Sequence, residues 1–129
     1  MNERFIINIS RFMLGGVFLI FGLNYFFEFM PLGALEKQEA VEFMSGLDSA
    51  GYFFPFLRIV EISMGLLLIS GFYTALALVI LMPVNINIFL FNLFLDPTGF
   101  PLSLVMMIAH IYLAWVYREH YKGLFKNRL

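Results

Sequence analysis

The sequence predicts an all-α membrane protein: a four-transmembrane-helix bundle with the N and C termini cytoplasmic. Hydrophobic residues make up 61% of the 129 positions and charged residues only 13%, whereas soluble proteins carry about 25% charged residues. A helix needs about 20 largely apolar residues to cross a bilayer. Four runs approach that length, at residues 5–29, 53–72, 74–95 and 101–117. We therefore expect a single domain over residues 1–129 that folds in lipid.

The first run, residues 5–29, is expected to be a retained helix. Arg11 interrupts its apolar stretch, and no cleavage site with small residues follows, so a removed signal peptide is disfavoured. Arg11, Gly15 and Gly22 fall on one helical face, and Gly65 follows Glu61 by one turn in the second run. Small residues allow helix backbones to approach closely, so Gly15, Gly22 and Gly65 are candidate helix-packing positions.

The connection between the first two runs, residues 31–52, is acidic. Leu35, Val41, Phe43 and Leu47 recur in it at spacings compatible with a short amphipathic helix in the first outer loop. Glycines 46 and 51 are expected to bound that helix. A solvated acidic loop is equally compatible with the composition.

The remaining connections are short, so successive helices should be antiparallel. Residues 71–74 suffice for a tight turn, and Pro101 suits the first turn of the fourth helix. Pro83 should kink the third helix because it cannot donate a hydrogen bond to Val79. Asn85 and Asn87 are expected to satisfy the freed carbonyl.

Charge distribution predicts the orientation. Cytoplasmic flanks of membrane helices are enriched in Lys and Arg. The side that holds both termini has six such residues, and the other side has only Lys37 and Arg58. The six are Arg4, Arg11, Arg118, Lys122, Lys126 and Arg128. A net charge of −1 offers no basic surface for nucleic acid, and the absence of cysteine excludes thiolate chemistry carried by the chain. We expect no metal site.

Three polar residues reach a similar depth in three different runs. Glu61 lies eight residues into the second run, which at about 1.5 Å per residue is about 12 Å deep. His110 and Asn85 reach a comparable level in the fourth and third runs, and Asn92 shares the face of Asn85. Charges inside hydrocarbon are costly and often functional. The sequence thus favours a ligand or proton site around Glu61, His110 and Asn85.

Structural roles compete with that hypothesis. His110 and the asparagines could serve only as hydrogen-bonding links between helices. Glu61 could pair with Arg58 one turn earlier. Arg11 could simply extend towards the nearer membrane surface. These alternatives stay open at the level of the sequence.

Three segments resemble the DoxX-like family of small four-helix bacterial membrane proteins. They are RFMLGGVFLIFG at residues 11–22, RIVEISMGLLLISG at 58–71 and LMPVNINIFLFNLFLDPTGFP at 81–101. The resemblance extends over nearly the whole chain and implies a multi-pass protein of the bacterial inner membrane. Some members of that family are linked to thiosulfate:quinone oxidoreduction or to membrane oxidoreductase complexes. None of the matching segments is a catalytic signature.

The leading functional hypothesis is an accessory subunit of a membrane oxidoreductase system that binds a quinone or another small hydrophobic molecule in a cavity centred on Glu61. A membrane or cytoplasmic oxidoreductase would be its partner, beside the lipid bilayer itself. One alternative is a small proton-coupled transporter that uses Glu61. Another is a structural assembly partner, or a homo-oligomer, that docks through the face of Gly15, Gly16 and Gly22.

Overall fold

The computed structural model describes residues 2–31, 33 and 35–125, and it is all-helical over those residues. The long helices are α1 (Glu3–Phe27), α3 (Phe53–Ser70), α4 (Thr74–Phe94) and α5 (Phe100–Val116). The shorter elements are α2 (Gln38–Asp48), η1 (Pro97–Gly99), η2 (Arg118–His120) and η3 (Lys122–Phe125). The predicted all-α fold with four long apolar helices is confirmed, and the short helix expected between the first two of them is present as α2.

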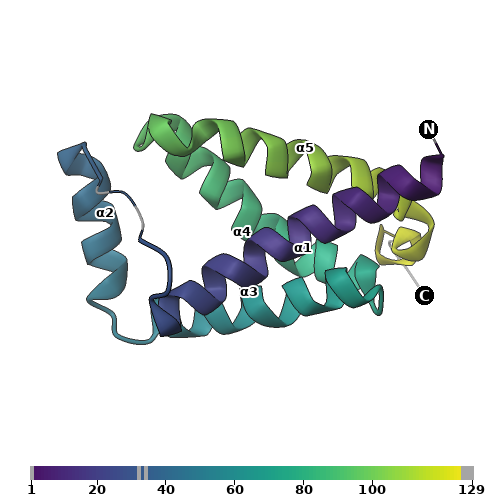
Figure 1. Ribbon diagram of the computed structural model, residues 1–129, viewed down its shortest axis with the longest axis horizontal. Helices are drawn as coiled ribbons and strands as arrows, with labels where there is room; N and C mark the ends of the chain where they lie inside the picture. The colour runs from purple at the N-terminus through teal and green to yellow at the C-terminus, as the bar shows by residue number, and fades with distance from the viewer. Residues whose placement is uncertain (1, 32, 34, 126–129) are drawn as a thin grey trace.

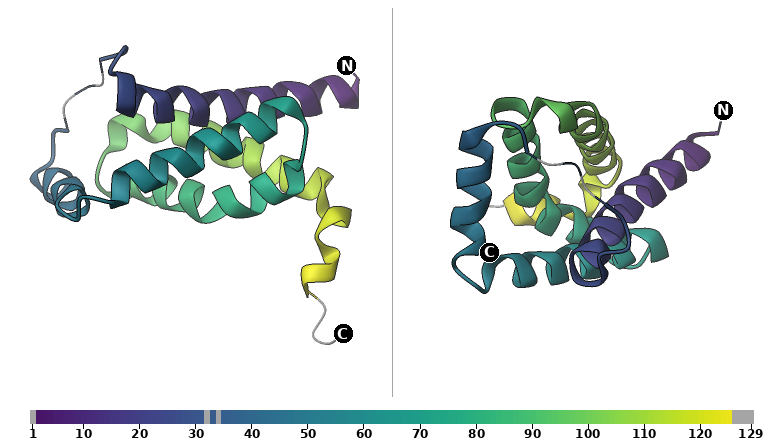
Figure 2. Two further views of the ribbon diagram at one scale, coloured as in Figure 1. Left: turned by 90° about the horizontal axis from the view of Figure 1, so that it is seen from below. Right: turned by 60° about the vertical axis from the view of Figure 1, so that its left-hand side comes forward.

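The four long helices run along the longest axis of the molecule, and α2 lies across one end of them (Figure 1). The start of α1 lies with η2 and η3 at the opposite end, as the two further views also show (Figure 2). We call these the α2 end and the terminal end. The topology therefore places the N-terminus and the segment after α5 on the same side of the bundle.

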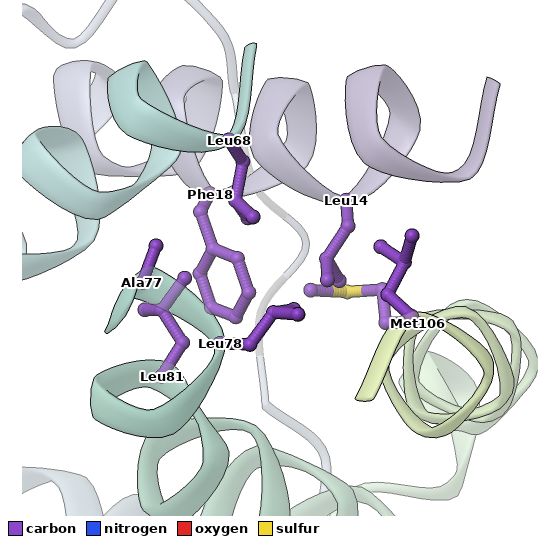
Figure 3. Close-up of a cluster of buried hydrophobic side chains, with 8 residues drawn as sticks. Leu14, Phe18, Leu68, Ala77, Leu78, Leu81 and Met106 are labelled. Atoms are coloured by element: carbon purple, nitrogen blue, oxygen red, sulfur yellow. The ribbon is translucent and has the colours of Figure 1, made fainter. Parts of the chain in front are cut away.

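The bundle has a narrow apolar core in its middle. Leu14 and Phe18 of α1 meet Leu68 of α3 and Leu81 of α4 there, with Met106 approaching from α5 (Figure 3). All five side chains are at most 4% exposed. This seam holds the four helices together, but it uses only one face of each helix.

Most of the remaining helix surface is apolar and faces outward. Each of the four long helical segments has an 18-residue window with mean hydropathy of at least 1.7, of which no more than 28% is buried. Large side chains such as Phe12, Phe56 and Ile108 are 48% to 65% exposed. Water around so much apolar surface is unfavourable. The chain is therefore a multi-pass integral membrane protein.

α1 packs closely against α3 through glycine. A Cβ atom added to Gly15 would lie 2.8 Å from the backbone oxygen of Gly65, and one added to Gly65 would lie 2.8 Å from that of Gly15. A Cβ atom added to Gly22 would lie 2.6 Å from the Ile62 side chain and 3.2 Å from the backbone oxygen of Arg58. Gly15 and Gly22 are thus occupied by α3 of the same chain, so the expected docking face for a partner is wrong at these positions. A Cβ atom on Gly16 would meet no atom within 4 Å.

Several predicted boundaries need correction. α1 begins at Glu3 because the side chain of Asn2 accepts a hydrogen bond from the Arg4 amide, and it ends at Phe27 because Glu28 adopts a left-handed conformation. α2 continues through Gly46, which was expected to bound it, and the sharp turn comes at Gly51, where φ is 81°. A glycine inside a helix costs only about 1 kcal/mol relative to alanine, so it need not end the helix.

The expected partners of the carbonyl freed by Pro83 are also wrong. The Asn87 side chain donates to the carbonyl of Pro83 itself at 2.9 Å, and Asn85 donates towards α5. Neither bonds to Val79. An asparagine two or four residues beyond the proline bonds more easily to the preceding turn or to a neighbouring helix than to a carbonyl six or eight residues back.

Candidate functional site

The buried carboxylate of Glu61 forms an ion pair with Arg58 inside α3. Arg58 Nη1 donates to Glu61 Oε1 at 2.6 Å, and the side chains are 21% and 2% exposed respectively. The spacing of three residues places both groups on neighbouring positions of one helical turn. The intrahelical pair that the sequence allowed is therefore present, and Glu61 is not an isolated charge.

Aromatic rings surround the other side of the Arg58 guanidinium. Its central carbon lies 5.8 Å from the ring centroid of Tyr25 and 5.6 Å from that of Phe54. These distances are within the range of cation–π attraction. Arg58 Nε is buried and has no hydrogen-bond partner among the described residues. A buried donor without a partner is unfavourable, so this nitrogen is a local cost of burying the Arg58 side chain.

A cavity of about 310 Å³ adjoins Arg58 at the α2 end. Three helices contribute to it, because α2 covers the end of the bundle next to α1 and α3 (Figure 2). The lining residues are Tyr25, Met44, Ser45, Asp48, Phe54 and Arg58. Its wall thus combines aromatic and apolar surface with one guanidinium, one carboxylate and the hydroxyl groups of Tyr25 and Ser45.

The position of this cavity corrects the expectation of a cavity centred on Glu61. Glu61 lines neither of the two cavities described here. Arg58 lines the cavity, and Glu61 is bonded to Arg58 without lining the cavity itself. The sequence did not identify Met44, Ser45 and Asp48, because the packing of α2 on the bundle depends on contacts that periodicity does not report. Tyr25 could have been found, since it follows Gly15 and Gly22 along one face of α1.

Asn85 and His110 form a second buried polar group, between α4 and α5. Asn85 Nδ2 lies 2.9 Å from His110 Nδ1, and His110 Nε2 lies 2.9 Å from the carbonyl oxygen of Leu78. A carbonyl only accepts, so Nε2 carries the proton and Nδ1 accepts from the amide. Both side chains are 0% exposed. No hydrogen bond joins this group to Glu61 among the described residues, so the three residues of similar depth form two separate clusters.

Asn92 serves the turn between α4 and α5. Its Nδ2 donates to Ser103 Oγ on α5 and, at 2.9 Å, to the carbonyl of Ile88 on its own helix. A Cβ atom at Gly99 would overlap Asn92 Oδ1, so a side chain there would displace the Asn92 amide. The geometry gives Asn92 a role in closing this hairpin.

Arg11 lies at the terminal end, on the C-terminal turn of α3. Its Nε donates to the carbonyl of Leu68 at 2.6 Å and its Nη1 to Asn8 Oδ1 at 2.9 Å. The last carbonyls of a helix lack intrahelical partners and carry partial negative charge. Arg11 thus ties α1 to the end of α3, which goes beyond the expected extension towards the membrane surface.

Tyr121 closes the terminal end. Its hydroxyl donates to the carbonyl of Ala114. Burial raises the pKa of this hydroxyl above its usual value, and nearby Arg118 acts in the opposite direction. The raised pKa keeps the hydroxyl protonated, as its role as a donor requires.

These features define a class of protein: a small integral membrane protein with a four-helix bundle, a buried arginine–carboxylate pair in its third element and a cavity at one end. The DoxX family model matches residues 6–94. The chain belongs to the DoxX family. The matched range ends with the last turn of α4, so α5, with His110, lies beyond it. Searches of curated proteins and of solved structures find no match.

Proposed function

We propose that this DoxX family protein binds the head group of a quinone, or a similar small hydrophobic molecule, in the cavity at the α2 end. The observation that carries the proposal is Arg58. Glu61 fixes its Nη1 at 2.6 Å, the rings of Tyr25 and Phe54 lie 5.8 Å and 5.6 Å from its guanidinium, and Arg58 lines the cavity together with both aromatic residues.

The chemistry of the wall suits such a ligand. A quinone ring is flat and apolar, and its two carbonyl oxygens only accept hydrogen bonds. Tyr25 and Phe54 offer ring faces, and Arg58 offers the donor. Ligand pockets usually combine apolar walls with a few placed polar groups and span about 300–1,000 Å³. The cavity of about 310 Å³ is open to one side, so it would cover one face of a head group and leave the rest of the molecule outside.

An accessory role follows from the composition. Reduction of a quinone to a quinol consumes two electrons and two protons. The chain has no cysteine and thus no thiol couple to supply the electrons. We therefore place the electron source in a partner oxidoreductase of the membrane or cytoplasm. Pull-down from native membranes tests this part of the proposal, because a stoichiometric oxidoreductase should be recovered.

The ion pair favours binding over proton-coupled transport. A transporter that used Glu61 would have to load and release a proton there, with access to each side in turn. Glu61 is 1% exposed, is bonded to Arg58 and lines neither described cavity. Liposome flux that depends on a pH gradient and is lost in Glu61→Gln would instead support the transporter.

Direct binding measurements test the proposal. We would titrate a short-chain ubiquinone into the full chain in lipid nanodiscs and compare Arg58→Gln, Glu61→Gln and the control Arg118→Gln, which alters an exposed arginine at the far end. We expect Kd to rise about tenfold or more in Arg58→Gln, since hydrogen bonds from charged groups contribute about 1.5–3 kcal/mol. Glu61→Gln should weaken binding by a smaller factor. Equal affinity in all four proteins would refute the proposal.

A further inference from the structure

A second cavity, of about 570 Å³, lies at the terminal end, away from the proposed quinone cavity. One wall comes from the start of α1 and consists of Asn2, Glu3, Arg4, Ile7, Asn8 and Arg11. Tyr117, directly after α5, provides the other wall. The cavity is thus a wedge between the beginning of α1 and the end of α5, which lie close together at this end (Figure 1).

Arg11 is fixed in an orientation that leaves donors free. Its Nε donates to the carbonyl of Leu68 and its Nη1 to Asn8 Oδ1. The central carbon of its guanidinium lies 4.9 Å from the Phe12 ring centroid. An arginine has five N–H donors, and these two bonds use two of them. Arg11 lines the cavity, and three of its donors have no hydrogen bond to the described residues, so they can serve a ligand once one is bound. A planar guanidinium held in place is well suited to bind a phosphate group through two parallel hydrogen bonds.

The charge of the wall matches one negative charge. Arg4 and Arg11 contribute two positive charges and Glu3 one negative charge, so the formal sum is +1. A phosphodiester carries a single negative charge near neutral pH. Asn8 is half-buried and already bonded to Arg11, so it orients the guanidinium rather than competing with the anion.

The surroundings distinguish a lipid from a free anion. Phe5, Ile6 and Ile9 lie beside the wall residues on α1 and are 38% to 51% exposed. The last apolar span ends with α5 at Val116, so Tyr117 lies at the end of the membrane-spanning segment. A molecule with an anionic head and apolar chains would place the head in the wedge and the chains along these side chains. Basic pockets between membrane helices are known to bind anionic lipid head groups.

We propose that this wedge is a binding site for the phosphate group of an anionic phospholipid, with Arg11 as its main ligand and Arg4 as a second. The site does not depend on the proposed quinone cavity, because the two share no lining residue.

Native mass spectrometry and lipid titration test the site. The full chain, purified in detergent, would be titrated with phosphatidylglycerol and, separately, with zwitterionic phosphatidylcholine. We expect phosphatidylglycerol to bind at least tenfold more tightly. Arg11→Gln should abolish most of this preference, and Arg4→Gln should reduce it about threefold. The control Arg118→Gln, at an exposed arginine of the same end that lines neither described cavity, should leave it unchanged.

Two further arms keep the result interpretable. Arg11→Gln also removes the bond to Leu68 and could impair folding, so Arg4→Gln, which alters an exposed residue, decides the matter if Arg11→Gln does not purify. Competition with inorganic phosphate separates the two sources of the anion. Displacement of the lipid by equimolar phosphate would overturn the assignment to a lipid. No preference for phosphatidylglycerol in the unmodified chain, or equal preference in Arg4→Gln and Arg118→Gln, would overturn the site itself.

Discussion

At the scale of single residues, the buried pair of Arg58 and Glu61 is the least expected feature of an otherwise apolar bundle. Two charges in a low dielectric are tolerable only when each stabilises the other and further polar contacts are made. Glu61 receives one bond from Arg58, and the aromatic rings of Tyr25 and Phe54 stabilise the guanidinium from the other side. The pair therefore behaves as one unit, in which Glu61 positions Arg58.

This coupling predicts a particular pattern of stabilities. Glu61→Ala should lower the free energy of unfolding by about 1.5–3 kcal/mol, because it removes the charged hydrogen bond to the partly buried guanidinium of Arg58. The double variant Arg58→Met/Glu61→Leu should recover most of the loss, since apolar side chains of similar volume replace the pair. Thermal unfolding of the protein in detergent measures both. A double variant as unstable as Glu61→Ala would contradict the interpretation of the two residues as a unit.

The sequence predicted which polar residues are buried but not how they group. Glu61, Asn85 and His110 share a depth, which follows from counting residues along straight helices. Their grouping depends on the rotation of each helix about its own axis, and this is set by packing. Asn85 and His110 meet because α4 and α5 are neighbours, whereas Glu61 finds its partner on its own helix. Counting residues along one helix could detect the pair of Glu61 and Arg58, but not the contact between Asn85 and His110.

At the scale of elements, the contact of α1 with α3 depends on two glycines that face each other. Gly15→Ala should destabilise the bundle by about 1–3 kcal/mol, the usual range for an added methyl group in a packed site. The backbone oxygen of Gly65, 2.8 Å from the new Cβ, cannot move without moving α3. Gly16→Ala is the matched control because its Cβ would meet no atom within 4 Å. Equal thermal stability of the two variants would show that α3 moves freely to accommodate the methyl group.

The long helices could be predicted to within a few residues, and α2 only in outline. A membrane span has to be long and apolar, so composition alone locates it. The 11 residues of α2 have no such constraint, and their helix gains stability by docking on the bundle. Ala40 is 0% exposed, and the Phe43 ring lies 5.7 Å from that of Phe91 on α4. Neither contact can be derived from the spacing of Leu35, Val41 and Leu47.

Docking of α2 should therefore control the cavity that it covers. Phe43→Ala removes the ring contact with Phe91 and should loosen α2, which would increase hydrogen exchange of amides 38–48. Quinone affinity should fall severalfold, since Met44, Ser45 and Asp48 would no longer be held against Arg58. Val41→Ala, which shortens an apolar side chain of the same helix without removing the ring contact with Phe91, is the control. If amide hydrogen exchange in α2 increased while the quinone affinity stayed unchanged, α2 would have no role in the binding site.

At the scale of the whole molecule, the two ends differ in charge as well as in shape. The α2 end has an acidic helix and Arg58, which is neutralised by Glu61. The terminal end has Arg4, Arg11, Arg118 and Lys122 close to the ends of α1 and α5. Because the four spans place these two ends on opposite membrane surfaces, the positive-inside rule predicts that the terminal end faces the cytoplasm.

Because the chain has no cysteine, single substitutions can report this orientation without a background. Glu39→Cys places a thiol on the exposed side of α2, and Glu119→Cys places one on η2, where the side chain is 66% exposed. Neither change removes a positive charge, so the bias that sets the orientation is kept. In intact cells, a membrane-impermeant maleimide should label the thiol at position 39 and not the thiol at 119, which should react only after the membrane is permeabilised. The reverse pattern would place the proposed quinone cavity on the cytoplasmic side and would exclude access to the Arg4 and Arg11 wedge from the cytoplasmic leaflet.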